Sequence, residues 1–216
     1  MSEHDFSRLR AAMVSNQLRT NAVTEPAILA ALDAVERDRF VPEDRAALAY
    51  VDVAVPLGGG RSLNAPLVTA RLIQDAHLQP GMAVLLVGAA TGYAAALLAR
   101  LGCRVTALES EPALAATARL RLEGTGVSLV EGDLAQGHAG GAPYDAIVID
   151  GAVDAVPDTL WDQLAEGGRM VSAWNDRGVS RLVRGVRTGA SRALVPFLEV
   201  DAVSLPGFAA PKEFTF

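Results

Sequence analysis

One stretch, residues 83–109, constrains the fold more than any other part of the chain. Ala83–Val87 is a short, continuous apolar run, as expected for a strand buried on both faces. It is followed by a turn of small residues, a helix candidate rich in Ala and Leu, and a second strand ending on an acid: Gly88–Gly92, Tyr93–Leu101 and Arg104–Glu109. This order predicts a βαβ unit that binds a nucleotide.

The turn and the acid indicate the ligand. Glycine lets a ligand approach the backbone, a helix N-terminus offers free N–H groups, and Glu109 can accept hydrogen bonds from both ribose hydroxyls. The glycines follow Gly-x-x-x-Gly, and Ala90 stands where a dinucleotide fold has glycine. A ligand with one nucleoside and no pyrophosphate, S-adenosyl-L-methionine, fits better. The alternative is an ordinary βαβ turn. The predicted cofactor contacts here are Gly88, Ala89, Ala90, Gly92, Tyr93, Glu109 and Ser110.

Length and composition limit the class of protein. The chain has 216 residues, half of them hydrophobic, which is enough for one large globular domain. A net charge of -6 argues against a nucleic-acid partner. The single cysteine, Cys103, excludes an internal disulfide and a cysteine metal cluster. The N-terminus lacks the apolar core of a signal peptide, and no apolar run suits a membrane span, so we expect a cytoplasmic protein.

Before the βαβ unit, the sequence predicts a helical extension. Apolar spacing favours one helix over Asp5–Arg19 and a second through Ile28–Val35, with Thr24 as its N-cap. Residues 50–57 are a candidate short strand. The glycine-rich segment Gly58–Pro66 comes next and is predicted to be a flexible loop, either a substrate lid or a plain connector.

After the unit, two further strands end on acids. Val127–Val130 leads to Asp133 and Leu134, and Tyr144–Ile149 leads to Asp150. Because ligands sit at the carboxyl ends of parallel strands, Asp133, Leu134 and Asp150 are predicted to join the cofactor crevice. A helix over 157–164, a strand over 169–174 and a closing antiparallel hairpin over 181–200 complete the pattern.

These elements predict an α/β fold: a Rossmann-like sandwich of the S-adenosylmethionine-dependent methyltransferase type, mostly parallel, with a C-terminal antiparallel hairpin. We divide the one compact domain into an N-terminal extension with the substrate loop (1–80), a cofactor-binding core (81–204) and a tail (205–216). The tail is apolar and interrupted by proline, so we expect it to pack irregularly or to line a partner surface.

Beyond these patterns, the chain resembles the protein-L-isoaspartate O-methyltransferase family over nearly its whole length before the tail. The more specific matches lie in the N-terminal part: Met13-Val-x-x-Gln-Leu18, Val35-x-Arg-x-x-Phe-Val-Pro42 and Ala49-Tyr-x-Asp52. Gly132-Asp133 and Ala142–Val148 also match. The resemblance implies S-adenosyl-L-methionine as cofactor, S-adenosyl-L-homocysteine as product, and methylation of free isoaspartyl carboxylates in damaged proteins. It also implies a protein or peptide substrate, and a monomer or homodimer.

The chain departs from the family in both functional loops. The family's substrate loop reads Thr-Ile-Ser-x-Pro and then His or Tyr, whereas Ser62, Asn64 and Leu67 stand at the threonine, serine and aromatic positions. Leu86 replaces an acid in the cofactor strand, which Asp150 could partly supply. The resemblance makes Asn64 and Ser62 the candidate catalytic residues. A carboxylate is already ionised at neutral pH and needs alignment more than a base, so the changes favour an altered substrate.

Two other readings stay open. The altered loops are also consistent with a non-catalytic relative that acts as a binding module. A metal-dependent small-molecule O-methyltransferase would use Asp150 and Asn175-Asp176 around Mg²⁺, since oxygen ligands suit a hard cation. The three histidines are not spaced like metal ligands, and we predict no metal-binding residues.

Overall fold

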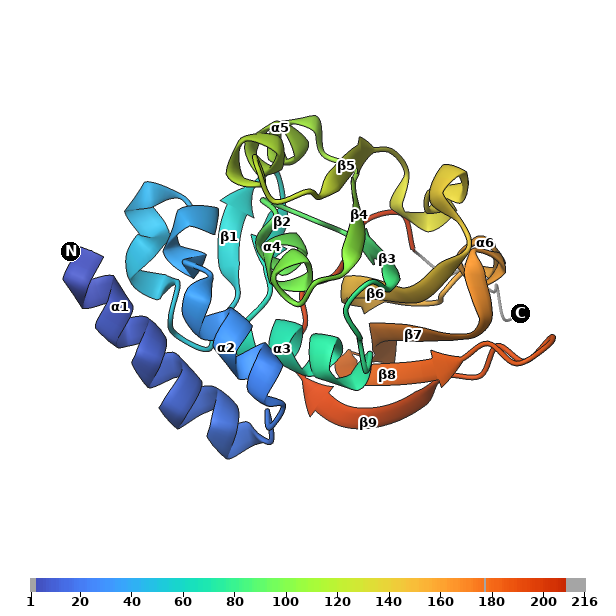
Figure 1. Cartoon of the computed structure of the whole chain (residues 1–216), viewed down its shortest axis with the longest axis horizontal. Helices are drawn as coiled ribbons and strands as arrows, with labels where there is room; N and C mark the ends of the chain where they lie inside the picture. Colours follow the sequence, from blue (N-terminus) through green and yellow to red (C-terminus); the bar gives the residue numbers. More distant parts are fainter. Residues whose placement is uncertain (1–2, 177, 209–216) are drawn as a thin grey trace, which may run out of the picture.

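The computed structural model describes residues 3–176 and 178–208, and a twisted sheet organises them (Figure 1). Its strand order is β5-β4-β3-β6-β7-β8-β9. Neighbouring strands from β5 to β7 are parallel, and β8 and β9 pair antiparallel at one edge. The strands are β3 (Ala83–Val87), β4 (Arg104–Glu109), β5 (Ser128–Glu131), β6 (Tyr144–Val153), β7 (Leu164–Asp176), β8 (Val179–Val186) and β9 (Val195–Val200). The predicted fold class is confirmed.

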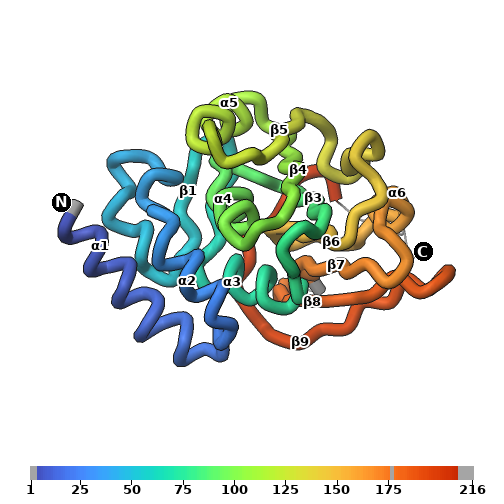
Figure 2. The backbone as a smooth tube through the Cα atoms, viewed as in Figure 1, coloured from blue at the N-terminus to red at the C-terminus, as the bar shows by residue number. Residues whose placement is uncertain are grey.

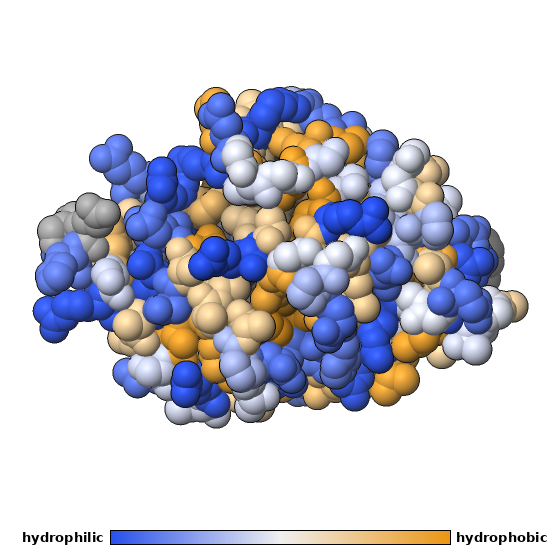
Figure 3. All heavy atoms as spheres, viewed as in Figure 1, coloured by the Kyte–Doolittle hydropathy of each residue, from blue (hydrophilic) through white to orange (hydrophobic). Residues whose placement is uncertain are grey.

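Alternate strand residues feed two hydrophobic layers. Val84 and Leu86 of β3 face the larger layer, and Leu85 and Val87 face the smaller one. The larger layer holds α2 (Pro26–Ala34), α3 (Pro66–Asp75), α4 (Tyr93–Arg100) and α5 (Pro112–Arg121); the smaller holds α6 (Asp158–Asp162) and the C-terminal segment. Burial on both faces explains why the inner strands lack polar alternation. Apolar atoms show at the centre of the face over α3 and α4, with charged side chains around them (Figure 3).

The N-terminal extension is helical, as predicted. α1 (Glu3–Ala12) continues without a break into a π-helical turn at Met13–Leu18 and a 3₁₀ turn at Arg19–Asn21. The cap assignment was wrong, because α2 begins at Pro26 after Glu25. The Thr24 N–H instead donates to Gln74 Oε1 at 2.7 Å, which ties the extension to α3. The other 3₁₀ turns are Arg37–Phe40, Glu43–Leu48, Leu134–Gln136 and Ala139–Gly141.

The glycine-rich segment forms a hairpin where the sequence predicted a flexible loop. β1 (Val55–Gly58) and β2 (Arg61–Leu63) pair antiparallel around Gly59 and Gly60. All of Gly58, Gly59 and Gly60 have positive φ, which glycine adopts without strain. In the backbone tube, β1 appears between the blue N-terminal helices and the strands of the large sheet (Figure 2). The hairpin fixes where the side chains of 61–64 can reach.

The chain after β9 returns across the sheet. Ser204 bridges Ala152 of β6 in parallel fashion, and Leu205 N–H donates to the Ala152 carbonyl at 2.9 Å. Leu205 and Phe208 are buried in the smaller layer. The first part of the predicted tail therefore packs as irregular chain on the core, and residues 209–216 lie outside the described residues.

Candidate functional site: a carboxylate at the switch point of the sheet

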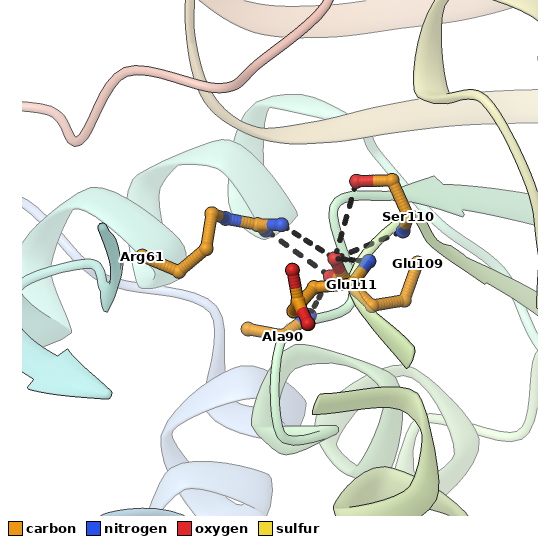
Figure 4. Close-up of polar contacts among 5 residues, drawn as sticks. All are labelled: Arg61, Ala90, Glu109, Ser110 and Glu111. Carbon is orange, nitrogen blue, oxygen red and sulfur yellow. Dashed lines mark hydrogen bonds and ion pairs between the residues drawn. The ribbon is translucent and has the colours of Figure 1, made fainter. Parts of the chain in front are cut away.

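Glu109 ends β4, and its carboxylate is fully buried among donors (Figure 4). Oε2 accepts from Ala90 N–H at 2.6 Å and from Arg61 Nη2 at 3.1 Å. Oε1 accepts from the N–H groups of Ser110 and Glu111, each at 2.9 Å, and from Arg61 Nη1. These charge-assisted hydrogen bonds hold the carboxylate in one orientation at the carboxyl edge of the sheet. The sequence predicted the acid and its place but not the arginine.

Arg61 reaches Glu109 from the hairpin, 48 positions earlier in the chain. The ion pair is two-pronged, with side-chain exposures of 6% for Arg61 and 0% for Glu109. A pair so deeply buried is held by geometry and hydrogen bonds, and removing one partner leaves an uncompensated buried charge. No sequence pattern predicts this partner, although a lone arginine directly after three glycines is a signal that deserves testing.

The turn after β3 has the compact shape that its small residues predict. Gly88 and Ala89 both donate their N–H groups to the Leu108 carbonyl at 3.0 Å, which joins the turn to β4. Ala90 has a φ of 49°, in the left-handed region that favours glycine, so the alanine is accommodated at a cost in backbone energy. That conformation aims the Ala90 N–H at Glu109. Gly92, with a φ of 101°, is the N-cap of α4.

Leu205 fills the space over two of the strand ends. A Cβ added to Gly88 would lie 3.0 Å from both terminal methyl carbons of Leu205, and one added to Gly151 would lie 2.5 Å from its Cγ. Gly88 follows β3 and Gly151 belongs to β6, the two strands between which the order of the sheet reverses. Ligands of open α/β sheets bind in that crevice. Here the chain's own leucine lies against both glycines.

Asn64 joins the hairpin side of the site to the C-terminal segment. Its Nδ2 donates to the Asp150 carbonyl and to Asp150 Oδ1, both at 2.9 Å. Its Oδ1 accepts from Val203 N–H at 2.9 Å. The side chain is buried, and all of these contacts are internal. The structure therefore gives the predicted catalytic Asn64 a positioning role between β6 and the returning chain.

Asp150 lies within β6, which continues to Val153, and is buried. Its Oδ1 also accepts from Thr69 Oγ1 at 3.2 Å. Burial raises the pKa of Asp150 above the ordinary carboxyl value, and the hydrogen bonds from Asn64 and Thr69 oppose that rise only in part. The predicted end of this strand at Asp150 was wrong, because β6 runs on to Val153, and the sequence analysis missed Thr69, which lies on α3.

Arg37 and Tyr93 are buried against each other, and Arg37 also contacts Asn64. The Arg37 guanidinium is fully buried, donates to the carbonyls of Ala49 and Asn64, and lies 4.7 Å from the centroid of the Tyr93 ring. The Tyr93 ring also packs edge-on against Phe40, with centroids 5.6 Å apart. Burial lowers the pKa of Arg37 and raises that of Tyr93. The surroundings of Tyr93 are those of a packing residue.

The remaining predicted residues lie around this centre. Asp133 is exposed, accepts from Ala135 N–H at 2.9 Å and lies near Gly207. Leu134 is buried in the smaller hydrophobic layer, and Ser62 sits on β2 opposite Pro56. Within residues 3–176 and 178–208, no group of three or more His, Cys, Asp or Glu is arranged to hold a metal ion. Helices of the described segments are too short or too polar to cross a membrane.

The Glu109 carboxylate could accept hydrogen bonds from the two ribose hydroxyls of a nucleoside cofactor in place of those from Arg61. Arg61 presents two N–H donors to the two oxygens of Glu109, which is the pairing that adjacent hydroxyls would make. Leu205 stands in for an apolar group against the glycine backbone of the turn. Arg61 and Leu205 thus lie against residues that the sequence analysis predicted to contact the cofactor.

Comparisons with known proteins identify the family. The family model described as Protein-L-isoaspartate(D-aspartate) O-methyltransferase (PCMT) matches residues 8–204. Protein-L-isoaspartate O-methyltransferase of Methylorubrum populi is 42% identical over 186 residues, which cover 85% of this chain and 87% of the relative. The fold defines a class I-like α/β methyltransferase sandwich, and the matches identify the family: the chain belongs to the protein-L-isoaspartate(D-aspartate) O-methyltransferase family.

Solved structures support the fold. A protein-L-isoaspartate O-methyltransferase superposes with a TM-score of 0.78 at 24% identity, covering 93% of this chain and 65% of the other. A beta-aspartate methyltransferase (PCMT) of Plasmodium falciparum, solved with S-adenosyl-L-homocysteine, gives 0.77 at 18% identity, covering 91% and 97%. The family, the fold and the methyltransferase class expected from the sequence are confirmed, and S-adenosyl-L-methionine is the cofactor of this family.

Proposed function

We propose that the chain is an S-adenosyl-L-methionine-dependent carboxyl O-methyltransferase that acts on a free carboxylate of a protein or peptide, with the isoaspartyl carboxylate as its leading substrate. The observation that carries the proposal is Glu109, buried at the end of β4 with its carboxylate held beside the Gly88–Gly92 turn. That acid, in that place, is what binding of one nucleoside requires. The family relatives are named for the isoaspartyl substrate.

The cofactor would be held by groups from three strand ends. Glu109 would take the ribose, the turn at Gly88–Gly92 would supply close backbone, and Asp133 and Leu134 would border the base. When bound, S-adenosyl-L-methionine supplies an electrophilic methyl group on a sulfonium. Asp150 lies across the switch point from the turn and is our proposed replacement for the acid missing at Leu86. An unchanged cofactor affinity in Asp150→Ala would remove that role.

The acceptor needs positioning more than proton transfer. A carboxyl group has a pKa of about 4 and is ionised at neutral pH, so no general base has to remove a proton. What the protein must supply is alignment and partial exclusion of water, which are proximity effects. Asn64 contributes by fixing the returning chain at Val203 against Asp150. Ser62, one residue beyond Arg61 on β2, remains our candidate for orienting the acceptor.

Methyl transfer to a synthetic isoaspartyl peptide tests the function. We expect base-labile methyl esters, measured as released methanol from a labelled methyl group, and no esters on the matched peptide with a normal aspartyl linkage. Equal labelling of the two peptides would remove the isoaspartyl specificity. No turnover with either peptide at high enzyme concentration would remove the proposed activity. The cytoplasmic location, the monomer or homodimer, and the domain division at 80 and 204 stay predictions.

A second candidate is a binding module that has lost catalysis, and one observation favours it. Arg61 and Leu205 lie where the nucleoside and the glycine-facing part of the cofactor would lie. A module of this kind predicts that S-adenosyl-L-homocysteine does not bind even after Arg61 is replaced. Binding to that variant at micromolar strength would exclude the module.

A further inference from the structure

Arg61 stands between Glu109 and any nucleoside. Its guanidinium uses two nitrogens on the two carboxylate oxygens, and the backbone N–H groups of Ala90, Ser110 and Glu111 take the other acceptor positions. A carboxylate offers about four lone-pair sites. Five N–H groups already point at these sites, so ribose hydroxyls would have to compete with Arg61 for the two oxygens of Glu109.

The hairpin that carries Arg61 has three consecutive glycines at its turn. Gly58, Gly59 and Gly60 have φ values of 97°, 58° and 75°, and a Cβ added to any of them would meet no atom within 4 Å. The space around these three positions is open, and glycine allows a wider range of backbone rotation than other residues. Arg61, Gly59 and Gly60 also line an open pocket of about 460 Å³ together with Ser110, Glu111 and residues 204–206. A displaced Arg61 side chain has this pocket beside it.

The charges around the pocket show what a displaced Arg61 would bind. Glu111 lines the same pocket, and the buried Glu109 is the ion-pair partner of Arg61, which also lines it. These acids disfavour the approach of an anionic acceptor. Arg37 is not among the residues that line the pocket, and its Nε and Nη2 donate to the carbonyls of Ala49 and Asn64. Arg61 is the positive side chain among those that line the pocket.

We propose that Arg61 changes carboxylate partners during the reaction cycle. In the cofactor-free protein it pairs with Glu109 and closes the nucleoside site. Once ribose hydroxyls hold Glu109, the guanidinium turns to the pocket and binds the carboxylate of the incoming acceptor, two N–H groups on two oxygens. This rests on the proposed function, and it makes Arg61 the residue that orders binding, cofactor first, and selects an anionic acceptor.

The exchange predicts effects of opposite sign for one substitution. Arg61→Gln removes a competitor for Glu109, so S-adenosyl-L-homocysteine should bind about tenfold more tightly, as for a site that is open in about a tenth of the molecules. The same substitution removes the charge that receives the acceptor, so KM for an isoaspartyl peptide should rise about tenfold at nearly unchanged kcat. A merely structural role for Arg61 would weaken both steps together.

Calorimetric titration with S-adenosyl-L-homocysteine and steady-state kinetics with the peptide test the exchange on the full chain. Arg61→Lys is the second variant: it keeps a cation and loses the two-pronged pairing, so it should tighten cofactor binding while raising KM less than Arg61→Gln. Arg181→Gln, which breaks an ion pair with Glu199 on the distant β8–β9 hairpin, is the matched control and should change neither value.

The two proposals fail in different ways. If S-adenosyl-L-homocysteine binds Arg61→Gln and Arg61→Lys no more tightly than the parent chain, Arg61 does not close the site and the exchange is wrong. If binding tightens but KM is unchanged, the acceptor half is wrong. If binding tightens and neither parent nor variants methylate any peptide, the closure stands and the proposed carboxyl methylation fails.

Discussion

The turn after β3 and the hairpin of β1 and β2 meet at one carboxylate, yet they depend on the sequence in different ways. The turn takes its shape from consecutive residues between Gly88 and Gly92, and its contact with Glu109 runs from Ala90 to the end of the next strand. The hairpin contributes a single side chain, Arg61, whose role exists only because the fold brings it to Glu109. The turn can therefore be predicted from neighbouring residues, whereas the contact of Arg61 with Glu109 depends on packing between distant segments.

The same contrast separates Glu109 from Glu131. The two acids occupy paired register positions on β4 and β5. Glu109 is fully buried with Arg61, whereas Glu131 is paired with Arg119 at the surface, with side-chain exposures of 57% for the arginine and 44% for the acid. Two ion pairs of similar composition should therefore contribute very differently, because burial removes the screening by water.

The largest expected effect is that of Glu109→Ala. The change leaves Arg61 buried without its partner and several N–H groups without an acceptor, so we expect the free energy of unfolding to fall by about 3–5 kcal/mol. Binding of S-adenosyl-L-homocysteine should be lost as well. Urea unfolding measures the first effect, and Glu131→Ala is the matched control, with an expected loss of about 0–1 kcal/mol. Equal losses of unfolding free energy in Glu109→Ala and Glu131→Ala would contradict the expected difference between the buried and the exposed ion pair.

Leu205→Ala tests the second occupant of the site. Removing the side chain from Gly88 and Gly151 leaves a cavity, so we expect the unfolding free energy to fall by about 2–4 kcal/mol. Because the vacated space borders the turn, S-adenosyl-L-homocysteine should bind several-fold more tightly. Leu120→Ala on the exposed side of α5, where the leucine is 76% exposed, should change neither quantity. A weaker affinity in Leu205→Ala would mean that the leucine supports the cofactor.

Asn64→Ala separates positioning from catalysis. The variant leaves the Val203 N–H and Asp150 without their shared partner, so we expect a loss of about 1–3 kcal/mol in unfolding free energy. A positioning residue should also release the returning chain, measured as faster hydrogen exchange at 202–205. Asn16→Ala, at an exposed site on the N-terminal helix, is the control. Lost turnover with unchanged stability and exchange would instead assign Asn64 to the chemistry.

The smallest effect concerns pH. Burial raises the pKa of Asp150 in the folded chain, so the folded state holds this proton more readily than the unfolded state. Its contribution to stability is full below the unfolded carboxyl pKa of about 4 and is lost as pH rises through the folded value. Relative to Asp150→Asn, the parent chain should therefore lose stability as pH rises from that point. If the stability difference between the parent chain and Asp150→Asn did not vary with pH, the raised pKa of Asp150 would be contradicted.

Much of the core could be predicted from the sequence, since its signals are local. The strand at Ala83–Val87 has the predicted bounds, and β4 ends on Glu109 as expected. Continuous apolar runs, small-residue turns and strand-end acids each act over a few residues. The same locality explains why Asp133 follows closely after the end of β5, whereas β6 runs past its predicted end at Asp150 to Val153.

The occupants of the site could not be predicted, because each depends on contacts between distant segments. Arg61 meets Glu109 across 48 positions, and Asn64 meets Val203 across 139. The sequence gives Gly58–Pro66 the composition of a free loop, and only the antiparallel pairing of β1 with β2 shows what its side chains reach. Leu205 looked like part of a tail; Pro206 and Gly207 beside it are the signal of a turn that could have marked a docked segment.

The most direct test of the account follows backbone hydrogen exchange in the unmodified chain with and without S-adenosyl-L-homocysteine. If the ligand displaces Arg61 and Leu205, exchange should become slower at 88–92 and 109–111, where the ligand binds. It should become faster at 58–63 and 203–206, the segments that carry the displaced side chains. Slower exchange in all of these segments would contradict the account, because the hairpin and the returning chain would then be supports of the bound cofactor and not its competitors.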